Sequence, residues 1–320
     1  MKTPKIVFLD RDTLPPNTTL KSLSFDHEFV AYPRTTADKV SERIADADFV
    51  ITNKVRLDAT ALAQAPNLKL IAVAATGYDI IDTEACGRLG ISVCNVRAYG
   101  ASSVSEHAFS LIFSLRRNIL AYRDAVRQGR WLDSDQFCFF DYPINDLRGS
   151  RLAIIGRGVL GMATADIGRA LGMEVVFSAR KDETREIDGA IPFDELLRTA
   201  DIISLHCPLT AETKNLIGAP EFAKMHRRPL IINTARGGLV NEPALVEALR
   251  SGQISGAGFD VTTIEPMPAN HPFVEILGIP NFILTPHIAW ASTQSTQTLA
   301  DQLIDNIELF AKGQPRNIVG

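Results

Sequence analysis

The sequence has few cysteines, no excess of positive charge and no long hydrophobic run. Its four cysteines, Cys86, Cys94, Cys138 and Cys207, are scattered without a CxxC pair, which argues against a zinc site or a disulfide framework and favours reduced thiols in a cytoplasmic protein. Lys and Arg total 33 against 37 Asp and Glu, and the net charge of −4 gives no electrostatic basis for binding nucleic acid or an anionic membrane. The apolar run at residues 6–9 is too short for a signal peptide, and no later run has the length of a membrane span.

What the sequence does contain is an alternation of short apolar runs with amphipathic stretches, over 320 residues of which 46% are hydrophobic and 22% charged. This length and composition suit two globular domains, and the alternation is typical of parallel sheets covered by helices. The runs are rich in Val, Ile and Leu, as expected of strands buried on both faces. They lie at residues 6–10, 48–52, 68–75 and 91–96 and, in a second series, at 151–156, 174–179, 201–206, 230–235, 256–260 and 282–286. We therefore predict two doubly wound α/β units.

Two longer helices are also predicted. A broad apolar stripe over residues 101–127 indicates one long, well-buried helix, with Ser103 and Glu106 as its capping box. A second stripe over residues 295–311 ends before Gly313 and indicates another helix. Because this second helix follows the last strand of the second series, we expect it to return to the first unit, which makes the first domain discontinuous.

A glycine-rich loop follows the run at residues 151–155. The segment Gly156-Arg157-Gly158-Val159-Leu160-Gly161 fits G-x-G-x-x-G and opens a helical stretch at 162–171, the context in which this pattern binds a dinucleotide. Gly156 would make the tight turn, Gly158 would admit a pyrophosphate close to the backbone, and Gly161 would let the helix pack closely on the strand. Backbone N–H groups at the helix N-terminus would then face the phosphates.

The next strand lacks the acid with which an NAD enzyme binds the adenosine ribose. It ends in Phe177-Ser178-Ala179-Arg180-Lys181, with Ala179 at the place of the acid. A carboxylate there would repel a 2′-phosphate, whereas Ser178, Arg180 and Lys181 could bind one, so the sequence predicts a preference for NADP over NAD. Use of NAD, or of both cofactors, stays open as an alternative because Asp182 and Glu183 dilute the positive charge.

Four further motifs, together with the glycine loop, are similar to those of D-2-hydroxyacid dehydrogenases. They are Ser103-Val104-Ser105-Glu106-His107, Asn233-Thr234-Ala235-Arg236-Gly237-Gly238, Gly258-Phe259-Asp260-Val261 leading to Glu265-Pro266, and Thr285-Pro286-His287-Ile288-Ala289-Trp290-Ala291-Ser292. Their order matches that family over essentially the whole chain, and the last motif most resembles its glycerate dehydrogenase and hydroxypyruvate (glyoxylate) reductase branch. The resemblance implies an α/β fold with a Rossmann cofactor-binding domain at residues 99–287, inserted into a smaller flavodoxin-like substrate-binding domain at 1–98 and 288–320. It also implies a homodimer.

Three residues carry the implied chemistry. By the resemblance, Arg236 binds the substrate carboxylate and polarises the keto oxygen, His287 protonates that oxygen as hydride arrives, and Glu265 pairs with His287. The residue types suit the reaction, because Arg is a planar cation that keeps its charge, His can donate a proton near neutral pH, and a neighbouring carboxylate favours the imidazolium. All three follow predicted strand ends, where doubly wound sheets bind ligands.

The resemblance also assigns residues around the cofactor and the substrate. Asp260 resembles the residue that binds the nicotinamide carboxamide, and Thr234 and Ala235 would line the cofactor cleft through their backbone. Further cofactor contacts would be His206, Cys207, Pro208 and Thr213, together with Arg236 and His287. Candidate substrate contacts are the backbone of Ala75-Thr76-Gly77 and the side chains of Asn53, Lys54 and Trp290, with an ordinary polar loop as the alternative for Asn53 and Lys54.

Two features have no role in the assignments above. His107 lies on the apolar helix and is predicted to be a hydrogen-bonded core residue rather than a catalyst, and His27, His226 and His271 have no partner in the sequence and are predicted to lie at the surface. The segment at residues 131–142 is unusually aromatic for a connecting loop. Such a segment favours packing, as in a dimer interface, with a cap over the substrate pocket as the alternative.

The sequence therefore predicts an NAD(P)-dependent reductase of small 2-keto acids, with hydroxypyruvate and glyoxylate as the first candidates and no metal. Alternatives within the family are D-lactate-type, phosphoglycerate and phosphite dehydrogenases. A dinucleotide-sensing corepressor on the same fold is the alternative from another class of protein, because a fold does not settle a function.

Overall fold

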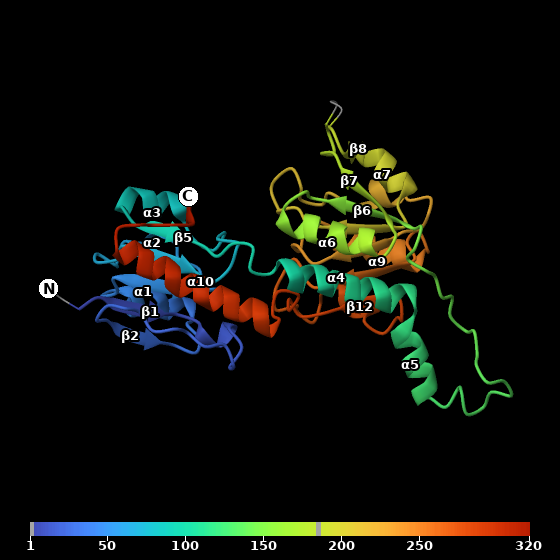
Figure 1. Ribbon diagram of the computed structural model, residues 1–320, viewed down its shortest axis with the longest axis horizontal. Coiled ribbons are helices and arrows are strands. Elements are labelled where there is room, and N and C mark those ends of the chain that lie inside the picture. The colour runs from blue at the N-terminus through green and yellow to red at the C-terminus, as the bar shows by residue number, and fades with distance from the viewer. Residues whose placement is uncertain (1–2, 184–186) are drawn as a thin grey trace. The chain divides into compact units, whose positions relative to one another are not determined.

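The computed structural model describes residues 3–183 and 187–320 and divides into two compact units, each built around a sheet. Unit 1 comprises Met1–Gly100 and Ala291–Gly320, and unit 2 comprises Ala101–Trp290. Unit 1 is thus formed by two separate stretches of chain, with unit 2 inserted between them in the sequence (Figure 1). Within the described ranges, no helix is both long enough and apolar enough to cross a membrane.

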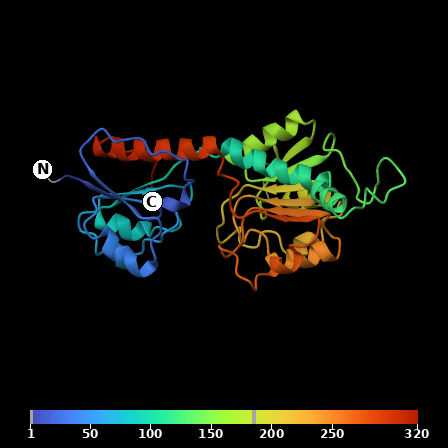
Figure 2. The ribbon, with the colours of Figure 1, turned by 90° about the horizontal axis from the view of Figure 1, so that it is seen from below.

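The described strands of unit 1 form one sheet in the order β13-β5-β4-β3-β1-β2. Its strands are β1 Lys5–Phe8, β2 Glu28–Ala31, β3 Phe49–Thr52, β4 Leu70–Val73, β5 Ser92–Cys94 and β13 Ile318–Val319. The pairing is parallel except at the edge, where β13 runs antiparallel to β5. Three short helices cover one face and one long helix covers the other (Figure 2): α1 Val40–Ile44, α2 Ala59–Leu62 and α3 Thr83–Leu89, opposite α10 Thr293–Ala311.

The described strands of unit 2 pair in parallel in the order β12-β11-β10-β9-β6-β7-β8. They are β6 Arg151–Ile155, β7 Glu174–Ser178, β8 Ala190–Ile191, β9 Ile202–Leu205, β10 Leu230–Asn233, β11 Gly256–Phe259 and β12 Phe282–Leu284. One face is covered by α4 Ala101–Arg116 and α6 Val159–Ala170, and the other by α7 Phe193–Thr199, α8 Ala219–Phe222 and α9 Glu242–Arg250 (Figures 1 and 2). The strand order reverses between β6 and β9, so the carboxyl ends of these strands flank the crevice where doubly wound sheets bind ligands.

The apolar runs predicted these strands because the strands are buried on both sides. Each of the ten runs overlaps a strand of the structure, and β3, β4, β9, β10 and β11 are buried at every residue. The sequence missed β2, β8 and β13. All three lie at sheet edges, where β2 is largely exposed and β8 and β13 have two residues each. Short edge strands carry little hydrophobic signal.

The prediction of one helix over residues 101–127 is wrong. The chain forms α4 and then α5 Ile119–Arg127, with Asn118 between them at a φ of +50°. The Asn118 side chain donates to the Pro143 carbonyl at 2.6 Å, so a later segment of the chain stabilises the break. The apolar pattern does not reveal the break because it continues on both sides of it.

The predicted capping box is also wrong. The helix α4 begins at Ala101, so Ser103 lies within its first turn. The Ser103 hydroxyl instead donates to the carbonyl of Ala289 at 2.6 Å. The prediction for the last helix is confirmed, because α10 begins after Ser292, whose side chain accepts from the Ser295 N–H, and it ends at Ala311 within unit 1.

An arm, defined as α5 with residues 128–146, extends away from the sheet of unit 2 (Figure 1). Three of its apolar side chains are almost fully exposed: Leu132, Phe137 and Phe140 are 88%, 86% and 84% exposed. The arm is braced internally, because Arg130 pairs with Asp141. It is thus an ordered segment with an uncovered apolar surface.

Candidate active site

The glycine-rich loop lies between β6 and α6, which confirms the predicted strand, loop and helix. Gly156 has a φ of +111°, and a Cβ added there would lie 2.6 Å from the backbone carbonyl of His206. A Cβ added to Gly161 would lie 2.0 Å from the Gly156 carbonyl oxygen. Both glycines are therefore required by close backbone approaches. The helix begins at Val159, three residues earlier than predicted.

This loop fits a dinucleotide. Gly158, by contrast with its neighbours, has open space where a Cβ would be. It is the N-cap of α6, and no side chain caps the helix there. The first N–H groups of a helix need acceptors and carry partial positive charge, so the backbone from Gly158 to Gly161 can receive a pyrophosphate.

On the other side of the crevice, β9 is followed by His206, Cys207 and Pro208. Burial lowers the pKa of His206 to about 4 and raises the pKa of the Cys207 thiol to about 11. Both side chains are therefore uncharged at neutral pH, and His206 contacts the Ser204 hydroxyl at 2.8 Å. Thr213 donates from its hydroxyl to the Pro208 carbonyl at 2.7 Å, which closes this loop.

The residues predicted to determine the preference for NADP over NAD lie at the end of β7. Ala179 pairs with Ile191 through its N–H, Arg180 is exposed, and the Ser178 hydroxyl donates to the Ala179 carbonyl at 2.6 Å. Arg157 of the glycine loop adds a cation here, because its guanidinium lies 5.3 Å from the centre of the Phe177 ring.

Lys181 is engaged elsewhere. Its ammonium contacts the buried Glu221 carboxylate at 2.9 Å. The other oxygen of Glu221 accepts from the Gly218 N–H at 2.9 Å. A phosphate would therefore compete with Glu221 for Lys181, which the sequence could not show.

Arg236 follows β10 in a turn braced by Asn233. The Asn233 side-chain oxygen accepts from the Ala235 N–H at 3.0 Å, and its amide donates to the Arg236 carbonyl at 2.9 Å. Thr234 and Ala235 are buried within this turn. The guanidinium of Arg236 donates to the Ala235 carbonyl at 2.8 Å, which directs the arginine back along its own turn.

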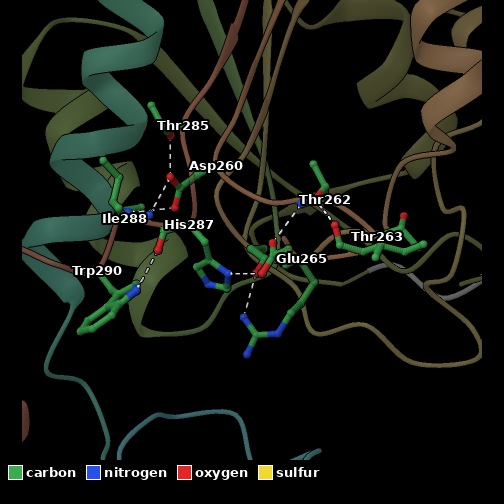
Figure 3. Close-up of polar contacts among 12 residues, drawn as sticks. Asp260, Thr262, Thr263, Glu265, Thr285, His287, Ile288 and Trp290 are labelled. Atoms are coloured by element: carbon green, nitrogen blue, oxygen red, sulfur yellow. Dashed lines mark hydrogen bonds and ion pairs between the residues drawn. The ribbon is translucent and has the colours of Figure 1, made fainter. Parts of the chain in front are cut away.

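Glu265 and His287 meet after the neighbouring strands β11 and β12. His287 Nδ1 lies 2.6 Å from Glu265 Oε2, and the two side chains point toward one another (Figure 3). With Nδ1 committed to the carboxylate, Nε2 is the nitrogen left to exchange a proton. The backbone of His287 has a φ of +56°, which is rare outside glycine and marks a residue that its surroundings hold in place.

Asp260 holds the loop that carries His287. Its carboxylate accepts from the N–H groups of Ile288 and Ala289 at 2.9 and 2.8 Å and from the Thr285 hydroxyl at 2.5 Å (Figure 3). The side chain is 1% exposed. Asp260 thus stabilises the loop that carries His287. Its contact with a nicotinamide carboxamide stays a prediction.

The turn of Arg236 is packed against the loop of Glu265. A Cβ added to Gly237 would lie 2.0 Å from the Thr262 carbonyl oxygen. Thr262 in turn donates its N–H to Glu265 Oε1 at 3.0 Å. The backbone segments that carry the predicted catalytic residues are therefore in direct contact.

Two other predicted residues border this site. The Trp290 indole N–H donates to the His287 carbonyl at 2.9 Å (Figure 3). His107 Nε2 lies 2.9 Å from the Thr285 hydroxyl, so the prediction of a hydrogen-bonded residue on this helix is confirmed.

The predicted substrate loops belong to unit 1 and follow neighbouring strands of its sheet. Asn53 and Lys54 come after β3, where their N–H groups donate to the carboxylate of Asp10 at 3.0 and 2.6 Å. Burial raises the pKa of Asp10, and these N–H groups oppose that rise. The loop Ala75–Gly77 follows β4, and the Thr76 hydroxyl donates to the Val96 carbonyl at 3.0 Å. Their role in binding substrate stays a prediction.

The prediction that His271 lies at the surface is wrong. Its side chain is buried and contacts the buried Glu242 at 2.9 Å. Sequence analysis also missed Glu242 and the bracing role of Asn233. An Asn two residues before the N–H that it accepts is a recognisable local turn, so Asn233 could have been found, whereas nothing in the sequence joins His271 to Glu242. In the described part of the chain, no three His, Cys, Asp or Glu side chains gather as a metal site would need.

Comparison with known families gives one match that spans more than half of the chain. The profile described as "D-isomer specific 2-hydroxyacid dehydrogenase, NAD binding domain" matches residues 109–289. These residues contain the glycine loop, Arg236, Glu265 and His287.

Individual relatives match over nearly the full length. The chain is 48% identical to a glycerate dehydrogenase of Methylorubrum extorquens, over 99% of this chain and 99% of the relative. It is 38% identical to a hydroxypyruvate reductase of Blautia hydrogenotrophica, over 98% of this chain and 99% of the relative. Among solved structures, an acyclic imino acid reductase in complex with NADPH and D-Arg superposes with a TM-score of 0.83 at 27% identity, covering 99% of this chain and 100% of that one.

Proposed function

The chain belongs to the D-isomer specific 2-hydroxyacid dehydrogenase family, and from this premise we propose that it reduces hydroxypyruvate and glyoxylate to their D-2-hydroxy acids with a nicotinamide dinucleotide. The observation that carries the proposal is the 2.6 Å contact between His287 and Glu265, because it leaves one ring nitrogen free to give a proton. The relatives named glycerate dehydrogenase and hydroxypyruvate reductase support the choice of substrate.

Each residue of the site has a task in this reaction. Arg236 binds the substrate carboxylate and polarises the keto oxygen with a charge that does not titrate. His287 donates the proton on Nε2 to that oxygen, while Glu265 holds Nδ1 and so orients the ring. A bound reduced nicotinamide supplies the hydride. The glycine loop from Gly156 to Gly161 would hold its pyrophosphate.

NADP is the preferred cofactor in this proposal. The absence of a carboxylate at Ala179 removes the group that would repel a 2′-phosphate. Arg180 is exposed at the end of β7, and Arg157 lies over Phe177 beside it. Because Lys181 already contacts Glu221 and the Ser178 hydroxyl already donates to the Ala179 carbonyl, we assign the phosphate first to Arg180, and only second to Ser178 and Lys181.

The working form in this proposal is a homodimer that uses the arm. Leu132, Phe137 and Phe140 are almost fully exposed on an internally braced segment, and an apolar surface of this kind is suited to a protein interface. A second copy would cover it by symmetry. The triple variant Leu132→Ser, Phe137→Ser, Phe140→Ser is expected to halve the mass measured by light scattering, and an unchanged mass would exclude the arm as the interface.

The compartment proposed is the cytoplasm. All four cysteines are free, and burial raises the pKa of Cys86 to about 11 and that of Cys94 to about 12. Free thiols suit a reducing compartment.

Steady-state oxidation of NADPH and NADH tests the proposed reaction, with hydroxypyruvate, glyoxylate and pyruvate supplied separately. Fast use of NADPH with hydroxypyruvate or glyoxylate is the expected result. Fast use of NADH alone would keep the reductase and contradict the cofactor preference. No turnover with any pair would contradict the proposed function.

A further inference from the structure

A buried acid, Glu242, and a buried histidine, His271, lie next to the catalytic loops. Neither has a role in the proposed reaction. Glu242 is the first residue of α9, and His271 precedes the 3-10 helix Pro272–Ile276. Their side chains are 8% and 3% exposed, and His271 Nε2 lies 2.9 Å from Glu242 Oε2. A buried carboxylate is costly unless it is well paired, so both of its oxygens need partners.

The hydrogen bonds determine which ring nitrogen of His271 carries the proton. His271 Nδ1 accepts from the Phe273 N–H at 3.2 Å, so this nitrogen carries no proton. The proton of the neutral ring is then on Nε2, which donates to Glu242. One oxygen of Glu242 is thereby satisfied by His271, and the carboxylate is held in one orientation.

The second oxygen of Glu242 reaches the catalytic loop. Glu242 Oε1 accepts from the Thr263 N–H at 2.7 Å. The preceding residue, Thr262, donates its N–H to Glu265 at 3.0 Å, and Glu265 contacts His287 at 2.6 Å. Hydrogen bonds thus link His271 and Glu242 to the Thr263 N–H, and others link the adjacent Thr262 N–H through Glu265 to His287. The covalent backbone between Thr262 and Thr263 joins the two sets.

The same backbone segment also supports the arginine. A Cβ added to Gly237 would lie 2.4 Å from the Thr263 nitrogen, as well as 2.0 Å from the Thr262 oxygen. The peptide group that Glu242 holds is therefore the one against which the turn of Arg236 packs. A shift of this peptide would move both catalytic loops.

We propose that Glu242 and His271 form a positioning pair that sets the 262–263 peptide and, through it, the geometry of both Arg236 and the Glu265–His287 contact. This inference rests on the proposed function, because it concerns the residues that would carry out the reduction. Neither residue touches substrate or cofactor in this account. They act through Thr263, and misplacement of catalytic groups by as little as 1 Å can cost about 100-fold in rate.

The test compares three variants of the full chain with one matched control. His271→Phe keeps an aromatic ring beside Phe273 but removes both nitrogens, and His271→Gln can place an N–H near the position of Nε2. Glu242→Gln removes the charge but keeps the shape. The control is Asp201→Asn, because Asp201 also accepts a backbone N–H, from Arg151 at 2.8 Å, but at the amino end of β9 in the same sheet.

The measurements are kcat and KM with NADPH and hydroxypyruvate, the NADPH dissociation constant, and the urea midpoint of each protein. We expect His271→Phe and Glu242→Gln to lower kcat about tenfold with little change in NADPH affinity. His271→Gln should recover kcat to within about threefold of the wild type. Asp201→Asn should lower the urea midpoint and leave kcat unchanged.

A wild-type kcat in His271→Phe would overturn the proposal, and so would a loss of kcat in Asp201→Asn of the same size. If His271→Phe does not fold, Glu242→Gln and His271→Gln decide between the same outcomes. Crystal structures of the wild type and the variants make the test independent of turnover. If the wild type reduced no 2-keto acid, the proposed function would fail, and this inference would be decided by whether the His287–Glu265 contact survives in Glu242→Gln.

Discussion

The loops that follow β10, β11 and β12 and the loop that follows β7 lie on the same edge of one sheet, yet they hold their charged groups in opposite ways. After β11, both oxygens of Glu265 are bonded, one to the Thr262 N–H and one to His287. After β7, Arg180 is exposed, and the contact of Lys181 is with Glu221 rather than with a group of its own loop.

The difference follows from what each loop does in the proposed reaction. Proton transfer depends on geometry, and a shift of the donor by about 1 Å can cost about 100-fold in rate. Attraction between a phosphate and a cation falls off slowly with distance, so the exact position of the cation matters less. The activity should therefore be sensitive to small shifts of the loops after β10, β11 and β12. The loop after β7, called the nucleotide loop below, should be sensitive mainly to changes of charge.

The largest effect is expected at the proton donor. His287→Ala removes the only group assigned to protonate the keto oxygen, and turnover should fall by about 10²–10⁴-fold. His226→Ala, at an exposed histidine, is the control and should retain the wild-type rate. Steady-state kinetics of reduction provide the measurement, and a near-wild-type rate in His287→Ala would overturn its assignment.

A single added methyl group should also disrupt the packing between the two catalytic loops. Gly237→Ala would place a Cβ 2.0 Å from the Thr262 oxygen, so the two catalytic loops must separate, and kcat/KM should fall by about 100-fold. Gly278→Ala, in the same unit, is the matched control, because no atom lies within 4 Å of the Cβ that it adds. Comparison of kcat/KM for the two variants tests the claim, which equal effects would contradict.

The nucleotide loop should respond to charge alone. Ala179→Asp introduces the carboxylate that repels a 2′-phosphate and binds a ribose, so the ratio of kcat/KM for NADPH to that for NADH should fall by about 10- to 100-fold. Ala179→Asn, which is similar in size but uncharged, should change the ratio much less. If both variants behave alike, size rather than charge governs this loop.

The smallest expected effect is on the free energy of unfolding and comes from His206. This residue follows β9, which lies in the sheet between β7 and the strands β10, β11 and β12. Its pKa is about 4 when folded, because burial disfavours the charged ring, against an ordinary 6.5. Between these values the unfolded chain binds more protons, so the free energy of unfolding should fall as the pH drops from 6.5 toward 4, by on the order of 1–3 kcal/mol. More than about one pH unit above 6.5 this residue contributes almost no slope.

Urea unfolding at about pH 7 and about pH 4.5 measures this slope. His206→Gln cannot take up the proton and should show a smaller decrease in unfolding free energy over the same interval. An equal decrease in the variant would assign the slope to other groups.

Prediction from sequence succeeded where the signal is local. The apolar runs found the buried strands, and the glycine pattern located the β6–α6 loop. It failed at edge strands such as β2 and at the break between α4 and α5. In the second case the periodicity continues past Asn118, and contacts with a distant segment, such as that with Pro143, 25 residues away, stabilise the break.

The sequence by itself determined the two doubly wound units, the order of the motifs with Arg236, Glu265 and His287, and the missing acid at Ala179. These depend on residue type and on spacing along the chain. Only the tertiary structure decided that His271 is buried against Glu242 and that Lys181 contacts Glu221. It also brought Gly237 against Thr262. Such pairs depend on how distant segments pack, and packing leaves no periodic trace in the order of the residues.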